Sequence, residues 1–357
     1  MKLKTVSLGL IATATAFVLG ACGNNTGGGN DNAEADNKTS VALITDTGGV
    51  NDRSFNQSAW EGLEAWGDSK GLTRGTGGFN YFQSATEADY QTNTNQAVAQ
   101  GFNLIFGIGF GLRNTITETA AQNPDKNFVI IDDVGEGHNV ASVTFADNEN
   151  AFLAGIAAAM QTNTDRVGFI GGVRGEVIDR FEAGFTAGVH HVNPDIHVDV
   201  QYAGSFNDPA QGQAIARAMI ASGADVIYQA AGGTGTGVFQ EVNSQNSLKD
   251  ADSKEKIWVI GVDRDQHDEG NYTSRDGKES NFVLVSTIKE VGSAVKSIAN
   301  LTEEGNFPGG QHIVYGLKDG GVDIAKANAS QEIQEAITKA REQIISGDIT
   351  VPTTPSN

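Results

Sequence analysis

The chain has 357 residues, of which 39% are hydrophobic and 19% charged, and its formal net charge is −20. This length and hydrophobic content can supply a buried core to each of two domains, which argues against a fibrous or structureless protein. An acidic surface also argues against nucleic acid and anionic lipid as partners, because both are bound through basic patches. A small neutral ligand remains compatible with this charge.

The first residues have the order of a bacterial lipoprotein signal. Lys2 and Lys4 precede an apolar run over residues 8–19, which is followed by L-G-A-C ending at Cys22, the single cysteine. The run is too short to span a membrane and is typical of a cleaved signal peptide. Removal of residues 1–21 would leave Cys22 to carry lipid, which predicts a protein anchored to the extracytoplasmic face of the cell membrane, without disulfides. A soluble secreted protein with an incidental cysteine is the alternative.

A polar segment follows this cysteine. Residues 22–39 contain almost nothing to bury and are rich in Gly, Asn and Asp, a composition typical of flexible linkers. We therefore predict a tether over these residues and a fold that begins near Ser40.

From Ser40 onward, apolar β-branched runs alternate with helical patterns. The predicted strands are VALIT, NLIFGIG, FVIID, ASVTF, RVGFIGG, HVDVQYAG, ADVIYQAAGG and KIWVIGVD. Six helices are predicted between and after these strands. One begins at residue 54, one ends at residue 122, and one ends at residue 160. Two cover residues 177–191 and 209–222, and the last ends at residue 247. Short, nearly continuous apolar strands between helices predict parallel sheets covered on both faces, so the expected fold class is α/β.

The last segments suggest a return to the first lobe. A strand is predicted at 282–290, a helix to about 304, strand-like sequence at 312–324, and an amphipathic helix to about 345. We expect two Rossmann-like lobes joined by a multi-strand hinge. The first lobe would contain 40–145 plus about 286–311, and the second 146–285 plus about 312–350.

Carboxylates and glycines follow the first predicted strand. Asp46, Gly48–Gly49, Asn51 and Asp52 lie within a few residues of its end. Ligands of doubly wound sheets bind beyond the carboxyl ends of the strands, and a carboxylate beside a carboxamide can hydrogen bond to the edge of a heterocycle. Capping of turns is the alternative role for Asp46 and Asp52.

Other predicted strand ends have the same character. They are Gly107 to Phe110, Asp132–Asp133, Gly232 to Gly235, and Asp263. Together they would line one face with carboxylates and bare backbone but few cations. Phosphate sites need Lys or Arg beside their amides, and the sequence has no G-x-x-x-x-G-K-[ST] motif. A neutral polyhydroxylated molecule with an aromatic ring therefore fits better than a free nucleotide.

The segment from Ser54 predicts a helix with one unusual aromatic. Ser54 and Gln57 fit a capping box, which places the helix start at Ser54. Phe55 and Trp66 fall in one apolar stripe, as core residues would, whereas Trp60 lies about 105° from the centre of this stripe. A large ring off the buried stripe can flank a cleft. Packing at the surface or against a second element is the alternative for Trp60.

Signatures of enzymes are missing from the sequence. In a nucleoside hydrolase, the nearest enzymatic alternative, the first strand ends in D-x-D-x-x-x-D-D. Aligning Asn51–Asp52 with the last pair puts Thr45 and Thr47 where two calcium-binding aspartates belong. The sequence has no G-x-S-x-G and no H-E-x-x-H, and His190–His191 and His197 are expected at the surface. We predict no catalytic residues, no cofactor and no metal.

The chain resembles the basic membrane protein family over nearly its whole length from Ser40. The resemblance rests on the lipoprotein signal, the tether and the strings GGVNDRSFNQSAWEGL, FVIIDD, NENAFLAGIAAAM, RFEAGFTAGV, AAGGTGTGVF and VIGVDRDQ. Members of this family are nucleoside-binding lipoproteins of ABC importers. The resemblance implies a type I periplasmic binding protein fold, in which two α/β lobes close on the ligand around a three-strand hinge.

The resemblance also implies roles for residues. Asn51, Asp52 and Asp132 match positions that contact the base, and Trp60 matches an aromatic that stacks on it. The ribose is expected near Gly232 or Gly233, Asp263 and Lys289. A second stacking aromatic is expected from the other lobe, for which Tyr228, Phe181 and Phe110 are candidates. The full set of predicted ligand-binding residues is Asp46, Asn51, Asp52, Phe55, Trp60, Asp132, Gly232, Gly233, Asp263 and Lys289.

These predictions describe a substrate-binding lipoprotein of an ABC importer. We expect a monomer, anchored through Cys22, that captures nucleosides and delivers them to permease and ATPase subunits, with lobe closure as the signal that the permease recognises. A pentose or hexose receptor of the same fold is the near alternative, because fold alone does not determine the ligand. A nucleoside hydrolase is the more distant one.

Overall fold

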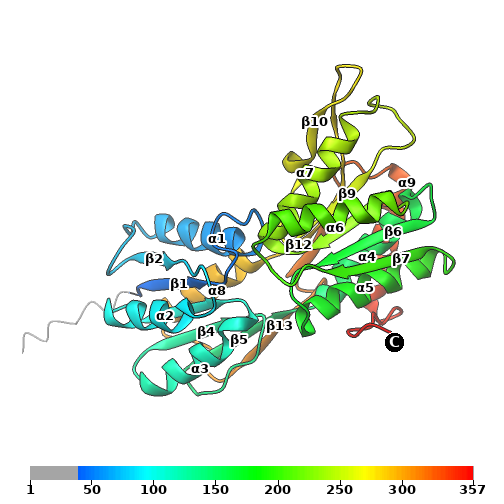
Figure 1. Cartoon of the computed structure of the whole chain (residues 1–357). Coiled ribbons are helices and arrows are strands. Elements are labelled where there is room, and N and C mark those ends of the chain that lie inside the picture. The colour runs from blue at the N-terminus through cyan, green and yellow to red at the C-terminus, as the bar shows by residue number, and fades with distance from the viewer. Residues whose placement is uncertain (1–38, 357) are drawn as a thin grey trace, which may run out of the picture. The chain divides into compact units, whose positions relative to one another are not determined.

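Two six-stranded sheets organise the protein, one in each of two lobes (Figure 1). The computed structural model describes residues 39–356. The predicted signal peptide, Cys22 and the predicted tether up to residue 38 lie outside the described residues. No helix between residues 39 and 356 combines the length and apolar character that crossing a bilayer requires.

The first sheet has the strand order β13-β5-β4-β3-β1-β2, and all of its neighbouring strands are parallel. Its strands are β1 (Val41–Thr45), β2 (Phe79–Phe82), β3 (Leu104–Ile108), β4 (Asn127–Ile131), β5 (Val140–Phe145) and β13 (His312–Tyr315). Its helices are α1 (Phe55–Ser69), α2 (Asp89–Ala99), α3 (Arg113–Gln122) and α8 (Val291–Glu303).

Both faces of this sheet are covered by helices. Leu43 of β1 belongs to the same apolar cluster as Leu63 of α1, whereas the next residue, Ile44, packs in a different cluster with Ile116 of α3. Successive strand residues point to opposite faces of a sheet. The continuous apolar run of β1 is therefore explained by burial on both sides.

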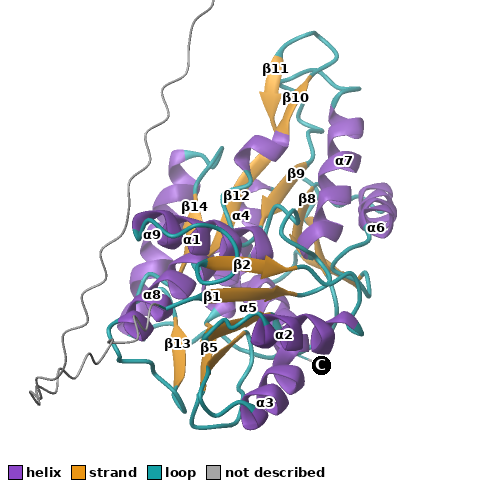
Figure 2. Ribbon diagram, turned by 90° about the vertical axis from the view of Figure 1, so that its left-hand side faces the viewer, coloured by secondary structure: helices purple, strands orange, loops and turns teal. Residues whose placement is uncertain are grey.

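The second sheet has the order β14-β12-β9-β8-β6-β7, in which only β14 is antiparallel to its neighbour. Its strands are β6 (Arg166–Gly171), β7 (His197–Tyr202), β8 (Val226–Ala230), β9 (Trp258–Gly261), β12 (Val283–Lys289) and β14 (Val322–Ala325). Its helices are α4 (Asp147–Gln161), α5 (Glu176–Val192), α6 (Pro209–Ala221), α7 (Gly235–Asn246) and α9 (Gln331–Ser346). A hairpin of β10 (Asn271–Thr273) and β11 (Glu279–Asn281) projects beyond β9 (Figure 2).

Within the described residues the chain passes between the lobes three times, after β5, after β12 and after β13. Two of the predicted lobe limits differ from this arrangement. The limit near 286 divides β12, which pairs in the second sheet as a whole, and the limit near 312 precedes β13, which pairs with β5 of the first sheet. The stretch expected as one unit at 312–324 forms two strands in different sheets, because apolar character does not specify a pairing partner.

Helices α4 and α5 approach each other closely enough to require glycine. A Cβ atom on Gly184 would collide with the backbone of Asn148, and one on Gly188 with the backbone of Phe152. The absence of these side chains lets α5 pack directly on α4. This contact fixes the position of the first turns of α5, which contribute to the cavity described next.

Candidate functional site

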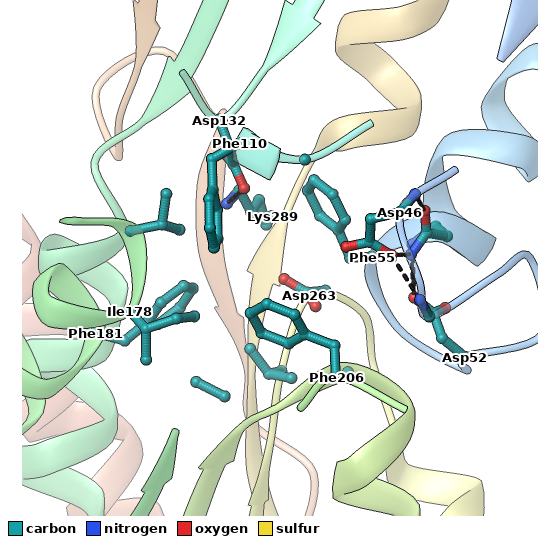
Figure 3. Close-up of a pocket in the computed structure, with 17 residues that line it drawn as sticks. Asp46, Asp52, Phe55, Phe110, Asp132, Ile178, Phe181, Phe206, Asp263 and Lys289 are labelled. Atoms are coloured by element: carbon teal, nitrogen blue, oxygen red, sulfur yellow. Dashed lines mark hydrogen bonds and ion pairs between the residues drawn. The ribbon is translucent and has the colours of Figure 1, made fainter. Parts of the chain in front are cut away.

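A cavity lies between the two lobes and receives side chains from both (Figure 3). Its empty space is about 490 Å³, a volume that includes the solvent at its open side. The first lobe contributes Asp46, Gly48, Asp52, Phe55, Asn56, Gly109, Phe110 and Asp132 to its wall. The second lobe contributes Val177, Ile178, Phe181, Phe206, Ala230, Gly232, Val262, Asp263 and Lys289.

The polar groups of the wall come from the carboxyl ends of the strands. Asp46 follows β1, Asp132 follows β4, Asp263 lies two residues beyond β9, and Lys289 is the last residue of β12. Asp132 and Asp263 adopt φ angles of 72° and 67°, a backbone conformation that is uncommon outside glycine and often found at functional sites. The structure thus brings together the polar strand ends that the sequence analysis selected.

Asp46, Asp52 and Asn56 form one hydrogen-bonded network at the start of α1. Nδ2 of Asn56 donates to Oδ1 of Asp46 at 2.7 Å and to Oδ2 of Asp52 at 2.9 Å. Oδ1 of Asn56 accepts from the backbone N–H of Asp46 at 3.2 Å. A single amide side chain therefore holds two carboxyl groups side by side.

The predicted capping box of α1 is not formed. The helix begins at Phe55, and it is the side chain of Asp52 that accepts the N–H groups of Ser54, Asn56 and Gln57, at 2.9, 2.8 and 3.1 Å. The Ser54 hydroxyl donates instead to Oδ2 of Asp263 in the other lobe. Ser54 does occupy the N-cap position, as predicted. The predicted capping bond is absent because the Asp52 carboxylate accepts the free N–H groups of the first turn instead.

Lys289 is the centre of a buried ion cluster between the lobes. Its Nζ lies 2.6 Å from Oδ2 of Asp132 and 3.1 Å from Oδ1 of Asp147, and Lys289 is only 2% exposed. Arg180 of α5 completes the cluster at 3.2 Å from Oδ2 of Asp147. Burial disfavours the ammonium, but Asp132, Asp147 and Asp263 outweigh this effect and raise the pKa of Lys289. Lys289 therefore stays charged inside the cavity.

Two of the cavity carboxyls titrate near neutral pH. Burial, followed by repulsion from Asp52, raises the pKa of Asp46 to about 7, although hydrogen bonds from Gly48 and Asn56 lower it. Burial likewise raises the pKa of Asp263 to about 7, although Lys289 lowers it. Burial also raises the pKa of Asp52. Near pH 7 the cavity can thus present a carboxyl group either as an acceptor or, when protonated, as a donor.

Phenyl rings from both lobes form the apolar part of the wall. Phe55 and Phe110 belong to the first lobe, and Phe181 and Phe206 to the second. The rings of Phe110 and Phe206 meet edge to face, with centroids 6.1 Å apart and planes at 71°. Figure 3 shows Phe110, Phe206 and Phe181 around the space between the lobes. Flat apolar surfaces are therefore available on both sides of a ligand.

Trp60 does not contribute to this wall. It is 9% exposed and packs against Tyr81 and Phe79 of β2, with ring centroids 4.8 and 5.7 Å away, while Arg74 lies over its ring at 5.0 Å. The predicted stacking role for Trp60 is contradicted by this placement. Trp60 lies off the main apolar stripe of α1 because this side of the helix packs against β2.

Three further predicted residues also lie apart from the cavity wall. Asn51 is exposed and lines a separate surface pocket with Arg53 and Glu269. Gly233 is buried next to the wall residue Gly232 but does not line the cavity. Tyr228, one of the candidates for the second aromatic, is fully buried and its hydroxyl lies 2.9 Å from that of Thr287. Phe110 and Phe181 are the two candidates that reach the cavity.

Sequence reasoning missed Asn56 and Phe206. Asn56 stands one position after Phe55 in a segment that was assigned to a helix, so its contact with the preceding loop had no sequence signal. Phe206 lies in the loop after β7, four residues beyond the last residue of this strand. The rule that strand ends carry the site would have found Phe206 if it had been applied to apolar as well as polar residues.

Comparisons with known proteins point to one family. A family model described as "ABC transporter substrate-binding protein PnrA-like" matches residues 38–354. The "ABC transporter nucleoside-binding protein BmpA" of Lactococcus lactis subsp. cremoris is 53% identical over 353 residues, covering 99% of this chain and 99% of that protein. "Basic membrane protein A" of Borreliella burgdorferi is 32% identical over 319 residues, covering 87% of each.

The fold has a counterpart among solved structures. An ABC transporter system solute-binding protein from Aeropyrum pernix K1 matches with a TM-score of 0.75 at 24% identity, covering 89% of this chain and 94% of that chain. The predicted α/β class, with two mostly parallel sheets in a type I periplasmic binding protein fold, is confirmed.

Proposed function

Because the chain belongs to the family of PnrA-like ABC transporter substrate-binding proteins, we propose that it captures nucleosides in the cavity between its lobes and delivers them to the permease of an ABC importer. The observation that carries the proposal is the composition of the cavity wall, in which phenyl rings from both lobes lie beside buried carboxyl and ammonium groups. Such a wall suits a ligand with a flat aromatic part and a part rich in hydroxyl groups. The name of the 53% identical relative supports the same ligand class.

The aromatic and the charged residues of the wall would bind different parts of the ligand. Stacking of a base on an aromatic side chain is worth about 1–3 kcal/mol. Hydrogen bonds from hydroxyl groups to Asp263, or to another charged group of the wall, add about 1.5–3 kcal/mol each, before the cost of ordering ligand and protein. Several such contacts in a closed cavity are enough to hold a scarce nutrient tightly.

The charges of the wall favour a nucleoside over a nucleotide. Asp46, Asp52, Asp132 and Asp263 all line the cavity. Among the residues that the structure describes, Lys289 is the one cation of the wall, and it is already paired with Asp132 and Asp147. A phosphate group would meet carboxylates without a free cation to balance it. AMP is therefore expected to bind far more weakly than adenosine.

The position of the cavity between the lobes supports the transport role. Ligand that contacts both lobes stabilises the closed arrangement, which the permease can recognise. We propose that a lipid on Cys22 anchors the protein as a monomer at the extracytoplasmic face of the membrane, where permease and ATPase subunits complete the importer. The protein would bind its ligand without catalysing a reaction or using a cofactor.

A pentose receptor is the second candidate. Carboxylates together with aromatic rings also suit a free sugar, and they are the groups that line this cavity. Ribose is therefore the decisive comparison ligand, because it offers the hydroxyl groups of a nucleoside without the base.

Calorimetric titration of the purified protein, stripped of carried-over ligand by unfolding and refolding, tests the proposal. The ligands are inosine, guanosine, adenosine, uridine, cytidine, ribose and AMP. We expect the nucleosides to bind, whereas ribose and AMP should show no detectable binding. Binding of ribose alone would favour the sugar receptor, and binding of none would overturn both assignments. Release of ribose from inosine by the protein would overturn the non-enzymatic role.

A further inference from the structure

Asn56 occupies an unusual position between two acidic side chains. It is 2% exposed, and its one amide nitrogen donates to both Asp46 and Asp52, at 2.7 and 2.9 Å. Its amide oxygen accepts from the backbone N–H of Asp46 at 3.2 Å. Both N–H groups of this buried amide are therefore used within the network, so the side chain has no free donor for a ligand.

The network also determines which carboxyl oxygen remains available. Both oxygens of Asp52 accept N–H groups of the loop and the first turn of α1. Oδ1 of Asp46 accepts from Asn56 and from the N–H of Gly48 at 2.8 Å. Among the described residues, Oδ2 of Asp46 has no hydrogen-bond partner. It faces Gly109, where a Cβ atom would lie 3.2 Å away, so bare backbone leaves space beside it.

We propose that Asn56 is a positioning residue, which holds Asp46 and Asp52 together so that Oδ2 of Asp46 is the carboxyl oxygen that binds the ligand. This inference rests on the proposed function, because it places the ligand in the cavity. It also assigns different roles to the two acids. Asp52 organises the loop and the start of α1, while Asp46 contacts the ligand.

The protonation of Asp46 depends on this arrangement. The titratable groups near it are Asp52 in the same loop, Asp132 at the end of β4, Tyr90 on α2, and Asp263 and Lys289 across the cavity. The hydrogen bond from Asn56 lowers the pKa of Asp46, against burial and the nearby carboxylates. Removal of the amide would therefore raise this pKa further and leave the carboxyl neutral over more of the pH range.

The chemistry offered to a base changes with this proton. The ionised Oδ2 only accepts, so it suits an N–H group such as N1–H of hypoxanthine. The protonated Oδ2 can donate, so it suits a bare ring nitrogen such as N1 of adenine. By keeping Asp46 ionised to a lower pH, Asn56 favours ligands that present a donor to this position.

The test compares Asn56→Ala with Asn246→Ala. Asn246 is a matched control, because it is fully buried and its side chain bridges α7 to the backbone of Ile257, at 2.8 and 3.0 Å, away from the cavity. Carboxyl ¹³C NMR of aspartate-labelled, ligand-free protein would follow the titration of Asp46, whose signal is the one lost in Asp46→Asn. Calorimetry with inosine between pH 6 and 9 would follow binding.

We expect Asn56→Ala to move the Asp46 midpoint to higher pH and to weaken inosine binding at pH 7 about tenfold or more, as loss of a hydrogen bond to a charged group predicts. The midpoint for inosine affinity should move with it. Asn246→Ala should lower the melting temperature without changing either midpoint.

Two outcomes would overturn the inference. An unchanged Asp46 midpoint in Asn56→Ala would make Asn56 structural only, as would an inosine affinity that changes no more than in Asn246→Ala. If the wild type binds no nucleoside, the proposed function fails and so does the ligand contact of Oδ2. The NMR titration of the ligand-free protein would still decide whether Asn56 controls the state of Asp46, so the two failures remain distinguishable.

Discussion

Arg53 and Glu269 form an ion pair that joins the two lobes outside the cavity. Nη1 of Arg53 lies 2.6 and 2.7 Å from the two carboxylate oxygens of Glu269. The backbone carbonyl of Arg53 also accepts from Nε2 of the buried Gln266 at 2.9 Å, and Arg53 itself adopts a φ of 57°. None of these groups lines the cavity. The two lobes thus contact each other through groups outside the cavity wall, and these contacts do not need a ligand.

We predict that Glu269→Gln speeds ligand release. Exposed ion pairs contribute about 0.2–1 kcal/mol, which corresponds to a roughly one- to fivefold increase in the dissociation rate. Stopped-flow measurements of nucleoside release would detect this change, and high salt should reduce the difference between variant and wild type.

The matched control for this pair lies within the second lobe. Arg275 contacts Asp250 through two hydrogen bonds of 3.0 and 2.9 Å, so Asp250→Asn removes a similar exposed pair that does not join the lobes. It should leave the release rate unchanged. A charge exchange, Arg53→Glu with Glu269→Arg, should restore slow release. If Asp250→Asn speeds release as much as Glu269→Gln does, and the charge exchange does not restore slow release, the Arg53 pair does not stabilise closure.

Phe206→Ala should weaken nucleoside binding without a large loss of stability. Phe206 is half-buried, lines the cavity and contacts Phe110 of the other lobe, so its removal costs a stacking surface of about 1–3 kcal/mol. We expect a roughly five- to 150-fold higher Kd by calorimetry. An unchanged affinity would place the base elsewhere in the cavity.

Trp60→Ala should instead lower the stability of the protein and leave its nucleoside affinity nearly unchanged. The ring is buried against Tyr81 and Phe79, and truncation of a buried Trp costs about 3–5 kcal/mol. We expect a clear loss of melting temperature, whereas the fraction that stays folded should bind nucleoside with nearly normal affinity. A stable Trp60→Ala protein with abolished binding would restore the original stacking prediction.

Trp60 illustrates what the sequence can and cannot predict. A helical projection correctly placed it off the main stripe of α1, but an angle does not say which element lies on that side. Here β2 covers it, and β2 itself was not among the predicted strands. The capping of α1 failed for a similar reason, since two acceptors, Ser54 and Asp52, compete locally and only the folded loop decides between them.

The strand ends were predictable because they follow from a general property of parallel sheets. Asp46, Asp132 and Asp263 were selected by position after apolar runs, and all three line the cavity. Which sheet a late strand joins depends on long-range pairing, so β13 was assigned to the wrong lobe. The partners of Lys289 are likewise distant in sequence, because Asp132 follows β4 and Asp147 belongs to α4.

The ligand-free protein should become more stable as the pH falls from 8 to about 5. Asp46 and Asp263 have pKa values of about 7 in the folded protein, whereas an aspartate in the unfolded chain titrates near 3.9. Between these values the folded state binds more protons, so the free energy of unfolding decreases as the pH rises and is lowest above about 7. Melting temperatures across this range would show the slope.

Asp46→Asn isolates the contribution of one group to this pH dependence. The amide cannot ionise, so the variant should gain stability relative to the wild type above pH 7 and lose this advantage near pH 4. The difference between the two melting curves removes the effect of histidines and other groups common to both. A difference that does not vary with pH would contradict the raised pKa of Asp46.

Lys289→Met should strongly destabilise the protein. The substitution leaves Asp132 and Asp147 buried without their shared cation, and removal of one partner from a buried pair typically costs about 3–5 kcal/mol. Urea unfolding would measure the loss. Arg180 still reaches Asp147 at 3.2 Å, so most of the lost stability should come from the unpaired carboxylate of Asp132. The double variant Lys289→Met with Asp132→Asn should therefore recover stability. If the double variant is no more stable than the single one, the cost comes from lost packing of the lysine chain, and the ion pair contributes to ligand recognition rather than to folding.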